Sequence, residues 1–349
     1  MDVVVKSATE LREIAGKLLV SAEAPKDVAA TVAESLVLSN LKGLDSHGII
    51  KVPVYLQKIR NNELYPGARP VLSRKEGATA TVDAGWGFGQ TAGRFAVEAV
   101  VDIAREFGVG TVAVSRCNHV GRTGEYVERI AQQGFVGIAV CGGANPGGSV
   151  APYGGARRLF GTNPIAWGVP RGAGKPPIIS DFATSAIAAG KLDVFLHEGK
   201  PAPEDVLIDA EGRETTDPRA FFADGALLPF GRQKGYAINL LIEILATTWT
   251  GFAPASSREF RLGNPMVLTA WDGGRFTAQD RATGLVEELV ANIKATPPRQ
   301  GVDEVLLPGE PEERVFLERS KSGIPLAPAT WQALEEEALR RGIAVSAGN

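Results

Sequence analysis

Between about residues 78 and 183, the sequence alternates between strand-like and helix-like segments, and this pattern constrains the fold more than any other feature. ATATVDAG (78–85) alternates as a half-buried strand does, and VGTVAVS (109–115) has the apolar character of a buried strand. Further strands are predicted at 135–143, 164–170 and 176–183. Amphipathic helices are predicted at 91–108 and 125–134. This alternation predicts an α/β or α+β domain built around a sheet.

Both ends of the chain are predicted to be helical. Ser7 and Glu10 have the spacing of a capping box, and apolar residues follow at helical intervals. Further helices are expected after Pro25, at 48–64, at 234–251, at 282–298 and at 329–342. Pro53 must either lie in the first turn of the helix at 48–64 or bend that helix. We therefore predict a helical domain formed by residues 1–70 plus 285–349. The sheet domain, residues 71–284, is inserted between them, and the active site is expected between the two domains.

The composition argues against several kinds of partner. The net charge of −3 gives no electrostatic footprint for nucleic acid or for an anionic membrane. No apolar run reaches the roughly 18 residues that a membrane-spanning helix requires. Charged residues interrupt the N-terminal segment, so no signal peptide is expected. Cys117 and Cys141 form no CxxC pair and are expected to be free thiols, which favours a cytoplasmic location.

A glycine pattern at 108–113 resembles a dinucleotide fingerprint but lies in the wrong context. Gly108, Gly110 and Ala113 match G-x-G-x-x-G/A. The fingerprint requires a strand, a turn and then a helix, whereas here a helix precedes the glycines and a strand follows. Gly108 is therefore predicted to end the preceding helix. A bound nucleotide is not expected in a standard Rossmann crevice.

His47 lies in the segment GLDSHGI (43–49) and is a candidate general acid. An imidazole that titrates near neutral pH can protonate a ketone oxygen while hydride reaches the carbon. Ser46 or a carboxylate could fix its tautomer, and Lys51 lies one helical turn further along, where it could face a substrate carboxylate. Spacing alone equally allows that His47 caps a helix beside Asp45.

His119 lies in a predicted loop that also carries Gly121, Arg122 and Gly124. Backbone amides at a helix N-terminus can hold a phosphate, and Arg122 adds positive charge. Cys117 and His119 supply only one half of a zinc site, and the sequence offers no second half at ligand spacing. No metal is expected.

Asp181 and Lys234 each allow two interpretations. Asp181 is either a carboxylate at a helix N-terminus or the partner that orients a histidine. Lys234, between Gly231 and Gly235, enters an apolar helix that we expect to be buried. It is a candidate anchor for a phosphate or carboxylate, and a Schiff-base role is conceivable.

Taken together, the motifs resemble the type 2 malate/L-lactate dehydrogenase family, which is unrelated to the Rossmann-fold enzymes of the same name. The resemblance covers nearly the whole chain and rests on segments in family order: GLDSHGI, NHVGRTGEY, FGTNPIAWGVP, DFATSAIAAGK, FGRQKGYA and LLPGE. Residues 202–218 and 306–326 are most similar to the hydroxycarboxylate dehydrogenase B branch.

The resemblance implies a non-Rossmann NAD- or NADP-dependent homodimer that interconverts 2-oxo and 2-hydroxy acids. It implies that His47 is the proton donor or acceptor, with Ser46 beside it in a relay. His119, Gly121 and Arg122 would line the cofactor site, although some family members are assigned their acid/base histidine at the position of His119. Asp181 is a further catalytic candidate. Expected cofactor contacts are Asp181, Phe182, Ala183, Lys234, Gly309 and Glu310.

Thr162 is expected near the substrate or nicotinamide. Many family members have arginine where this chain has Lys51, and lysine lacks the two-donor fork of arginine. Two alternatives stay open: a nucleotide-binding homologue that has lost its chemistry, and a Schiff-base enzyme that uses Lys234.

Overall fold

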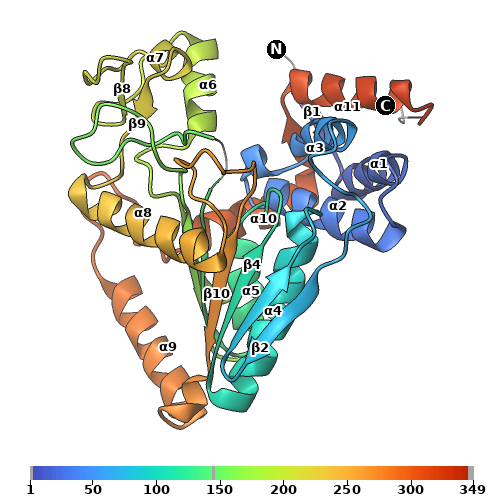
Figure 1. Cartoon of the computed structure of the whole chain (residues 1–349). Helices are drawn as coiled ribbons and strands as arrows, with labels where there is room; N and C mark the ends of the chain where they lie inside the picture. Colours follow the sequence, from blue (N-terminus) through green and yellow to red (C-terminus); the bar gives the residue numbers. More distant parts are fainter. Residues whose placement is uncertain (1–2, 144–145, 345–349) are drawn as a thin grey trace.

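The computed structural model describes residues 3–143 and 146–344. Segments from the two ends of the chain pack together as a helical unit, drawn in blue and red in Figure 1. A single apolar core joins them, because Leu334 and Ala338 belong to the same cluster as Leu18 and Leu36. Strand β1 (Val4–Lys6) also pairs antiparallel with β11 (Ile324–Leu326). The helices of the unit are α1 (Ala8–Val20), α2 (Lys26–Leu41), α3 (Lys51–Arg60), α10 (Glu310–Ser322) and α11 (Pro328–Arg340).

Helices α1 and α2 begin where the sequence predicts, whereas α3 begins at Lys51, three residues later than predicted. The Ser7 hydroxyl accepts a hydrogen bond from the Glu10 amide at 3.1 Å, and the Glu10 carboxylate accepts one from the Ser7 amide at 2.9 Å. This reciprocal pair is the predicted capping box. Helix α2 begins directly after Pro25, and Pro53 lies in the first turn of α3, where its missing N–H costs no helical hydrogen bond.

A mixed seven-stranded sheet lies at the centre of the described residues. Strands β3 and β4 are parallel, and the other neighbouring strands are antiparallel. The spatial order is β2 (Val71–Glu76), β3 (Thr79–Asp83), β4 (Val109–Ser115), β10 (Met266–Trp271), β5 (Val136–Cys141), β6 (Ile165–Val169), β7 (Ile178–Phe182).

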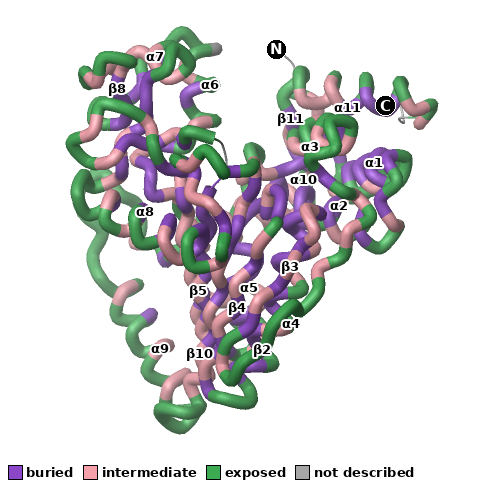
Figure 2. The backbone as a smooth tube through the Cα atoms, in the orientation of Figure 1, coloured by how far each residue is buried: buried purple, intermediate pink, exposed green. Residues whose placement is uncertain are grey.

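Helices cover both faces of this sheet. Ala139 and Leu268 face the core shared with α4 (Gly89–Phe107) and α5 (Gly124–Gln132), whereas Val140 and Val267 face α8 (Gln233–Ala246). This alternation follows from the two-residue period of a strand. Figure 2 shows the consequence, with buried positions concentrated along the sheet and in the helical unit.

Gly108 ends α4, as predicted. Its φ is +85°, and its amide donates to the carbonyl of Ala104. This left-handed conformation strongly favours glycine. Gly108 is therefore a helix cap rather than part of a phosphate-binding turn.

The sequence pattern missed the central strand β10. Met266 pairs with Val114 of β4 on one side and with Cys141 of β5 on the other. Local periodicity can indicate a strand, but it does not indicate that a distant segment will insert between two consecutive ones. The edge strand β2, all residues of which are exposed, was also missed.

A smaller layer packs at the end of the sheet domain, around Leu192 and Leu207. It contains α6 (Ala189–Glu198), β8 (Leu207–Ile208), α7 (Arg219–Phe222) and β9 (Ala226–Leu227). Figure 1 places α9 (Gln279–Ala295) away from the helical unit, and the predicted boundary at residue 285 falls inside this helix.

Helix α8 is less buried than its apolar sequence predicts. One side packs on β5 and β10, but Leu241 is 54% exposed and Trp249, just after the helix, is 77% exposed. Among the described residues, no helix is both long enough and apolar enough to cross a bilayer.

Candidate active site

The loop between α2 and α3 carries the first histidine. Asp45–His47 form a short 3-10 helix, η1. The buried side chain of Asn40 donates to Oδ1 of Asp45 at 2.6 Å and accepts from the amide of Ile49 at 2.7 Å. A Cβ atom at Gly48 would lie 2.2 Å from Oδ1 of Asn40, so this close approach requires glycine. Asn40 thereby fixes the turn that presents His47.

The nearest side-chain partner of His47 is Ser46. The Ser46 hydroxyl lies 3.1 Å from Nδ1 of His47. The Asp45 carboxylate instead pairs with Arg319 of α10, at 2.8 Å. No side chain caps the N-terminus of α3. Of the two interpretations of His47, the structure favours a histidine held by a serine over a helix cap beside Asp45.

His119 lies in the loop between β4 and α5, at the contact of the sheet domain with α3. Its Nδ1 is 2.7 Å from the hydroxyl of Tyr55. Nε2 of Gln90, on α4, donates to the same hydroxyl at 2.7 Å. The neighbouring Asn118 donates to the backbone carbonyl of Trp86 at 2.8 Å, which fixes the loop.

The fold brings the two predicted histidines together. Their ring centroids are 5.6 Å apart, and the planes are inclined by 21°. Burial, and then the charges of Lys51 and Arg122, lower the pKa of His47 to about 4. Burial, and then His47, Lys51 and Lys58, lower the pKa of His119 well below its ordinary value. Both rings are therefore neutral at pH 7 in the free protein.

One cation near the histidines, Lys51, has no acidic partner among the described residues. In the described part of the chain, Lys51 is half-buried and has no carboxylate within 4.0 Å, and burial lowers its pKa. Lys58 donates to Oδ1 of Asn118 at 3.3 Å. A buried charge without a partner is costly, so this site favours an anionic ligand.

A second group of predicted residues lines a cavity of about 230 Å³ between β7 and α10. Arg122, Asp181, Gly309 and Glu310 all contribute to its wall. The charge on the wall is mixed, because Lys42, Arg171 and Arg314 lie there with Glu312 and Glu313, and its apolar part includes Ile179 and Pro308.

Asp181 occupies a helix N-terminus, but not the one that follows it in sequence. Its Oδ2 accepts a hydrogen bond from the amide of Gly124, the first residue of α5, at 2.6 Å. Desolvation raises the pKa of Asp181, against the effects of this bond and of Arg122. In the described residues no hydrogen bond joins Asp181 to either histidine. Because the Asp181 carboxylate accepts a hydrogen bond from the Gly124 amide, that amide, which we expected to be free for a phosphate, is already occupied.

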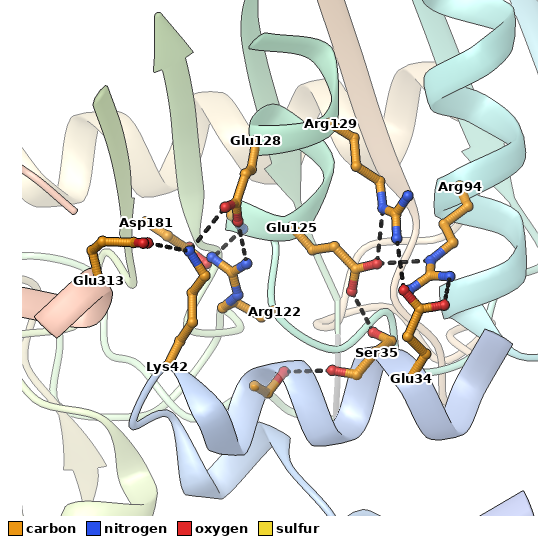
Figure 3. Close-up of polar contacts among 12 residues, drawn as sticks. Glu34, Ser35, Lys42, Arg94, Arg122, Glu125, Glu128, Arg129, Asp181 and Glu313 are labelled. Atoms are coloured by element: carbon orange, nitrogen blue, oxygen red, sulfur yellow. Dashed lines mark hydrogen bonds and ion pairs between the residues drawn. The ribbon is translucent and has the colours of Figure 1, made fainter. Parts of the chain in front are cut away.

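Two groups of ion pairs connect α2 with the sheet domain (Figure 3). In the first, Lys42 pairs with Glu128 at 2.8 Å and Glu313 at 3.4 Å, and Arg122 pairs with Glu128 at 2.8 Å. Desolvation alone would raise the pKa of Glu128, but these two cations lower it. Nε of Arg122 is buried and has no hydrogen-bond partner among the described residues.

The second group surrounds Glu125, which is 2% exposed. Its carboxylate accepts hydrogen bonds from Nε of Arg94 at 2.7 Å, Nε of Arg129 at 3.1 Å and the hydroxyl of Ser35 at 2.5 Å. Glu34 also pairs with Arg94, at 2.9 Å. Figure 3 shows that both groups connect α2 to the sheet domain.

The remaining predicted residues lie outside the cavity wall. The carbonyl of Thr162 accepts from the amide of Thr184 at 2.8 Å, next to the end of β7. The rings of Phe182 and Phe230 are in edge contact at 5.7 Å, so the segment of Phe182 and Ala183 approaches the segment that leads into Lys234. Lys234 is exposed in the first turn of α8.

Sequence reasoning missed Tyr55, Lys58 and Gln90. A signal existed for two of them, because Lys51, Tyr55 and Lys58 are spaced i, i+4 and i+7 and share one face of α3. Gln90 gave no signal, since its partner Tyr55 is 35 residues away in sequence, on α3. No cluster of three potential metal-ligating side chains occurs in the described residues.

The chain is similar to known proteins over nearly its full length. The model of the malate/L-lactate dehydrogenase family matches residues 6–335. The L-lactate dehydrogenase of Cupriavidus necator is 35% identical over 344 residues, which cover 97% of this chain and 98% of the relative. Hydroxycarboxylate dehydrogenase B of Escherichia coli is 34% identical, covering 90% and 88%.

A solved structure gives the same result. Sulfolactate dehydrogenase from Methanocaldococcus jannaschii superimposes with a TM-score of 0.89 at 30% identity, covering 98% of each chain. The chain belongs to the malate/L-lactate dehydrogenase family. The resemblance deduced from the ordered motifs is thereby confirmed. Membership of the malate/L-lactate dehydrogenase family makes the chain a dehydrogenase whose relatives act on hydroxy acids.

Proposed function

We propose that this chain is an NAD- or NADP-dependent oxidoreductase that interconverts 2-oxo and 2-hydroxy acids by hydride transfer. The observation that carries the proposal is the pair of stacked histidines, 5.6 Å apart, near Lys51, a cation with no carboxylate partner in the part of the chain that the structure describes. The relatives support the hydroxy-acid class of substrate. The histidine pair supplies groups able to move a proton.

His47 is the proposed proton donor and acceptor, with Ser46 as its partner. In the direction of oxidation, neutral His47 takes the proton from the substrate hydroxyl, and its lowered pKa keeps it neutral before substrate binds. In the reverse direction it must carry a proton. A carboxylate bound beside Lys51 offsets that cation and raises the pKa of His47, so anion binding itself favours the protonated state.

Lys51 is the proposed partner of the substrate carboxylate. It lies on the α3 face that reaches His119, and burial without an acidic partner makes it a favourable site for an anion. Thr162 is proposed to lie near the substrate or nicotinamide.

The residues of the β7–α10 cavity fit a nucleotide. Arg122 offers an unpartnered buried Nε–H, Lys42 and Arg171 add positive charge for a pyrophosphate, and Asp181 and Glu310 can accept from ribose hydroxyls. Bound NAD or NADP would accept or supply the hydride. We propose that Arg122, Asp181, Gly309 and Glu310 hold it, and that the remaining cofactor contacts are His119, Gly121, Phe182, Ala183 and Lys234. We propose that this site is not a Rossmann crevice, and the mixed sheet and the role of Gly108 as a helix cap support this proposal.

The decisive experiment follows the absorbance of reduced nicotinamide with a panel of 2-oxo acids. His47→Ala should lose about 10²- to 10⁴-fold in kcat, the usual contribution of a general acid. Unchanged turnover in this variant would move the acid/base role to His119.

The same assay addresses the alternatives. A nucleotide-binding homologue without chemistry would bind cofactor in a fluorescence titration but turn over no substrate. A Schiff-base enzyme would be trapped by borohydride. Lys234 is exposed and so lacks the desolvation that activates such lysines, which argues against that alternative.

A homodimer is also proposed. Leu240, Leu241 and Trp249 form exposed apolar surface on α8 and just after it, and such surface is often buried between subunits. Light scattering should give twice the mass of the chain, and a monomeric mass would contradict the proposal.

Cytoplasmic location is proposed as well. The two cysteines are free and buried, which is compatible with a reducing compartment.

A further inference from the structure

The two histidines have different partners, although their rings are stacked. Nδ1 of His47 meets the exposed hydroxyl of Ser46, whereas Nδ1 of His119 meets the buried hydroxyl of Tyr55. Two imidazolium rings 5.6 Å apart repel each other, so at most one of the two histidines is expected to take up the second ring proton that makes it an imidazolium. The partners of each ring decide which histidine takes it.

A directed chain of hydrogen bonds ends at His119. Nε2 of Gln90 donates to the hydroxyl of Tyr55, and the hydroxyl therefore has its own proton free for Nδ1 of His119. Gln90 is 0% exposed and Tyr55 1% exposed, so water does not compete for these bonds. Burial also raises the pKa of Tyr55, which keeps the hydroxyl protonated.

A neutral imidazole that accepts at Nδ1 carries its proton on Nε2. The Nε2 edge of His119 points away from Tyr55. The charged groups that act on His119 are Lys51 and Lys58 on α3 and His47 on η1, and all of them disfavour a second proton on its ring.

His47 has no such constraint. A serine hydroxyl can donate or accept by rotation, so Ser46 can accompany His47 through both protonation states. Its charged neighbours are Lys51 and Arg122, and Lys51 is the cation that a substrate carboxylate would offset.

We propose that Gln90 and Tyr55 are positioning residues that hold His119 as the neutral Nε2–H tautomer. His119 is then a fixed hydrogen-bond donor to an oxygen of the bound ligand, and His47 alone transfers the proton. This inference rests on the proposed function, and it gives a physical reason for the different roles of two histidines, either of which the family resemblance allows as the acid/base group.

The test reads the tautomer directly. Protein labelled with 15N-histidine should show one pyrrole-like signal for His119, at Nε2, with the assignment made by comparison with His119→Gln. Tyr55→Phe removes the donor to Nδ1 and should give a mixture of tautomers. Gln90→Leu leaves the hydroxyl free to rotate and should shift the population in the same direction. An Nδ1–H tautomer in the unmodified protein, or no change in Tyr55→Phe, would overturn the proposal.

Kinetics supply an independent readout. The pH profile of 2-hydroxy acid oxidation should show one ionisation, which disappears in His47→Gln together with most of the turnover. Tyr55→Phe should lower kcat about tenfold, the value of one hydrogen bond, and add a second ionisation from the released Nδ1. A profile unchanged in Tyr55→Phe contradicts the inference. Failure to turn over any 2-hydroxy acid contradicts the proposed function but leaves the tautomer measurable.

Discussion

The histidine site and the contact between α2 and α5 both join the helical unit to the sheet domain, but the cations in the two regions differ in whether a carboxylate pairs with them. At the contact of α2 with the sheet domain, Lys42, Arg94 and Arg122 each pair with at least one glutamate (Figure 3). At the histidine site, Lys51 has no acidic partner among the described residues.

This difference separates cations that glutamates balance within the protein from a cation that only a bound anion would balance. A buried cation with a partner recovers part of its desolvation cost within the protein, and removal of the partner is strongly destabilising. A half-buried cation without one recovers that cost only when an anion binds. The comparison therefore predicts opposite responses to mutation in the two regions.

The largest effect is expected at the α2–α5 contact. Glu125→Ala leaves Arg94 and Arg129 without their buried partner and should lower the free energy of unfolding by about 3–5 kcal/mol. Urea denaturation measures this change. The matched control is Glu34→Ala, whose carboxylate is half-exposed and should contribute about 1 kcal/mol or less. Equal losses of unfolding free energy in Glu125→Ala and Glu34→Ala would show that the buried and the half-exposed carboxylate contribute alike.

At the histidine site the effect should fall on substrate binding instead. Lys51→Met should raise KM for a 2-oxo acid about 10- to 100-fold, as expected for loss of a hydrogen bond to a charged group, without loss of stability. Steady-state kinetics and thermal melts measure the two quantities. Lys51→Arg keeps the charge and should keep KM low. A destabilised Lys51→Met with unchanged KM would mean that Lys51 is structural.

A smaller effect should appear in the pH dependence of stability. The pKa of His47 is about 4 in the folded protein and about 6.5 when unfolded, so between these values the unfolded chain binds a proton that the folded chain does not. The free energy of unfolding should therefore fall as the pH falls from about 6.5 to about 4. His47→Gln should make this decline shallower. If the free energy of unfolding changed with pH equally in His47→Gln and in the unmodified protein between pH 4 and 6.5, this result would contradict the lowered pKa of His47.

Much of the fold followed from local pattern. Ser7 and Glu10 mark the start of α1, Gly108 marks the end of α4, and VGTVAVS spans β4 without error. In each case the signal and the structure lie within a few residues of each other. The strand β10 was missed because its place depends on pairing with two strands far away in sequence.

The candidate site was predictable to a lesser extent. His47, Ser46, His119, Asp181 and Arg122 were identified as chemical groups, and the family was identified from the order of the motifs. The partner of Asp181 was not, because the α5 amide that it caps is distant in sequence. The roles of the site residues stay predictions until the variants are measured.

The sequence by itself determined the helices and strands with local signals, the family, and the residue types available for chemistry. Only the tertiary structure decided the surroundings of each group: the stacking of His47 on His119, the hydrogen bonds from Gln90 through Tyr55, and the partial burial of Lys51. The physical reason is that helix caps and strand periodicity arise from neighbouring residues. Protonation state and charge pairing depend instead on burial and on groups that the fold brings in from other segments.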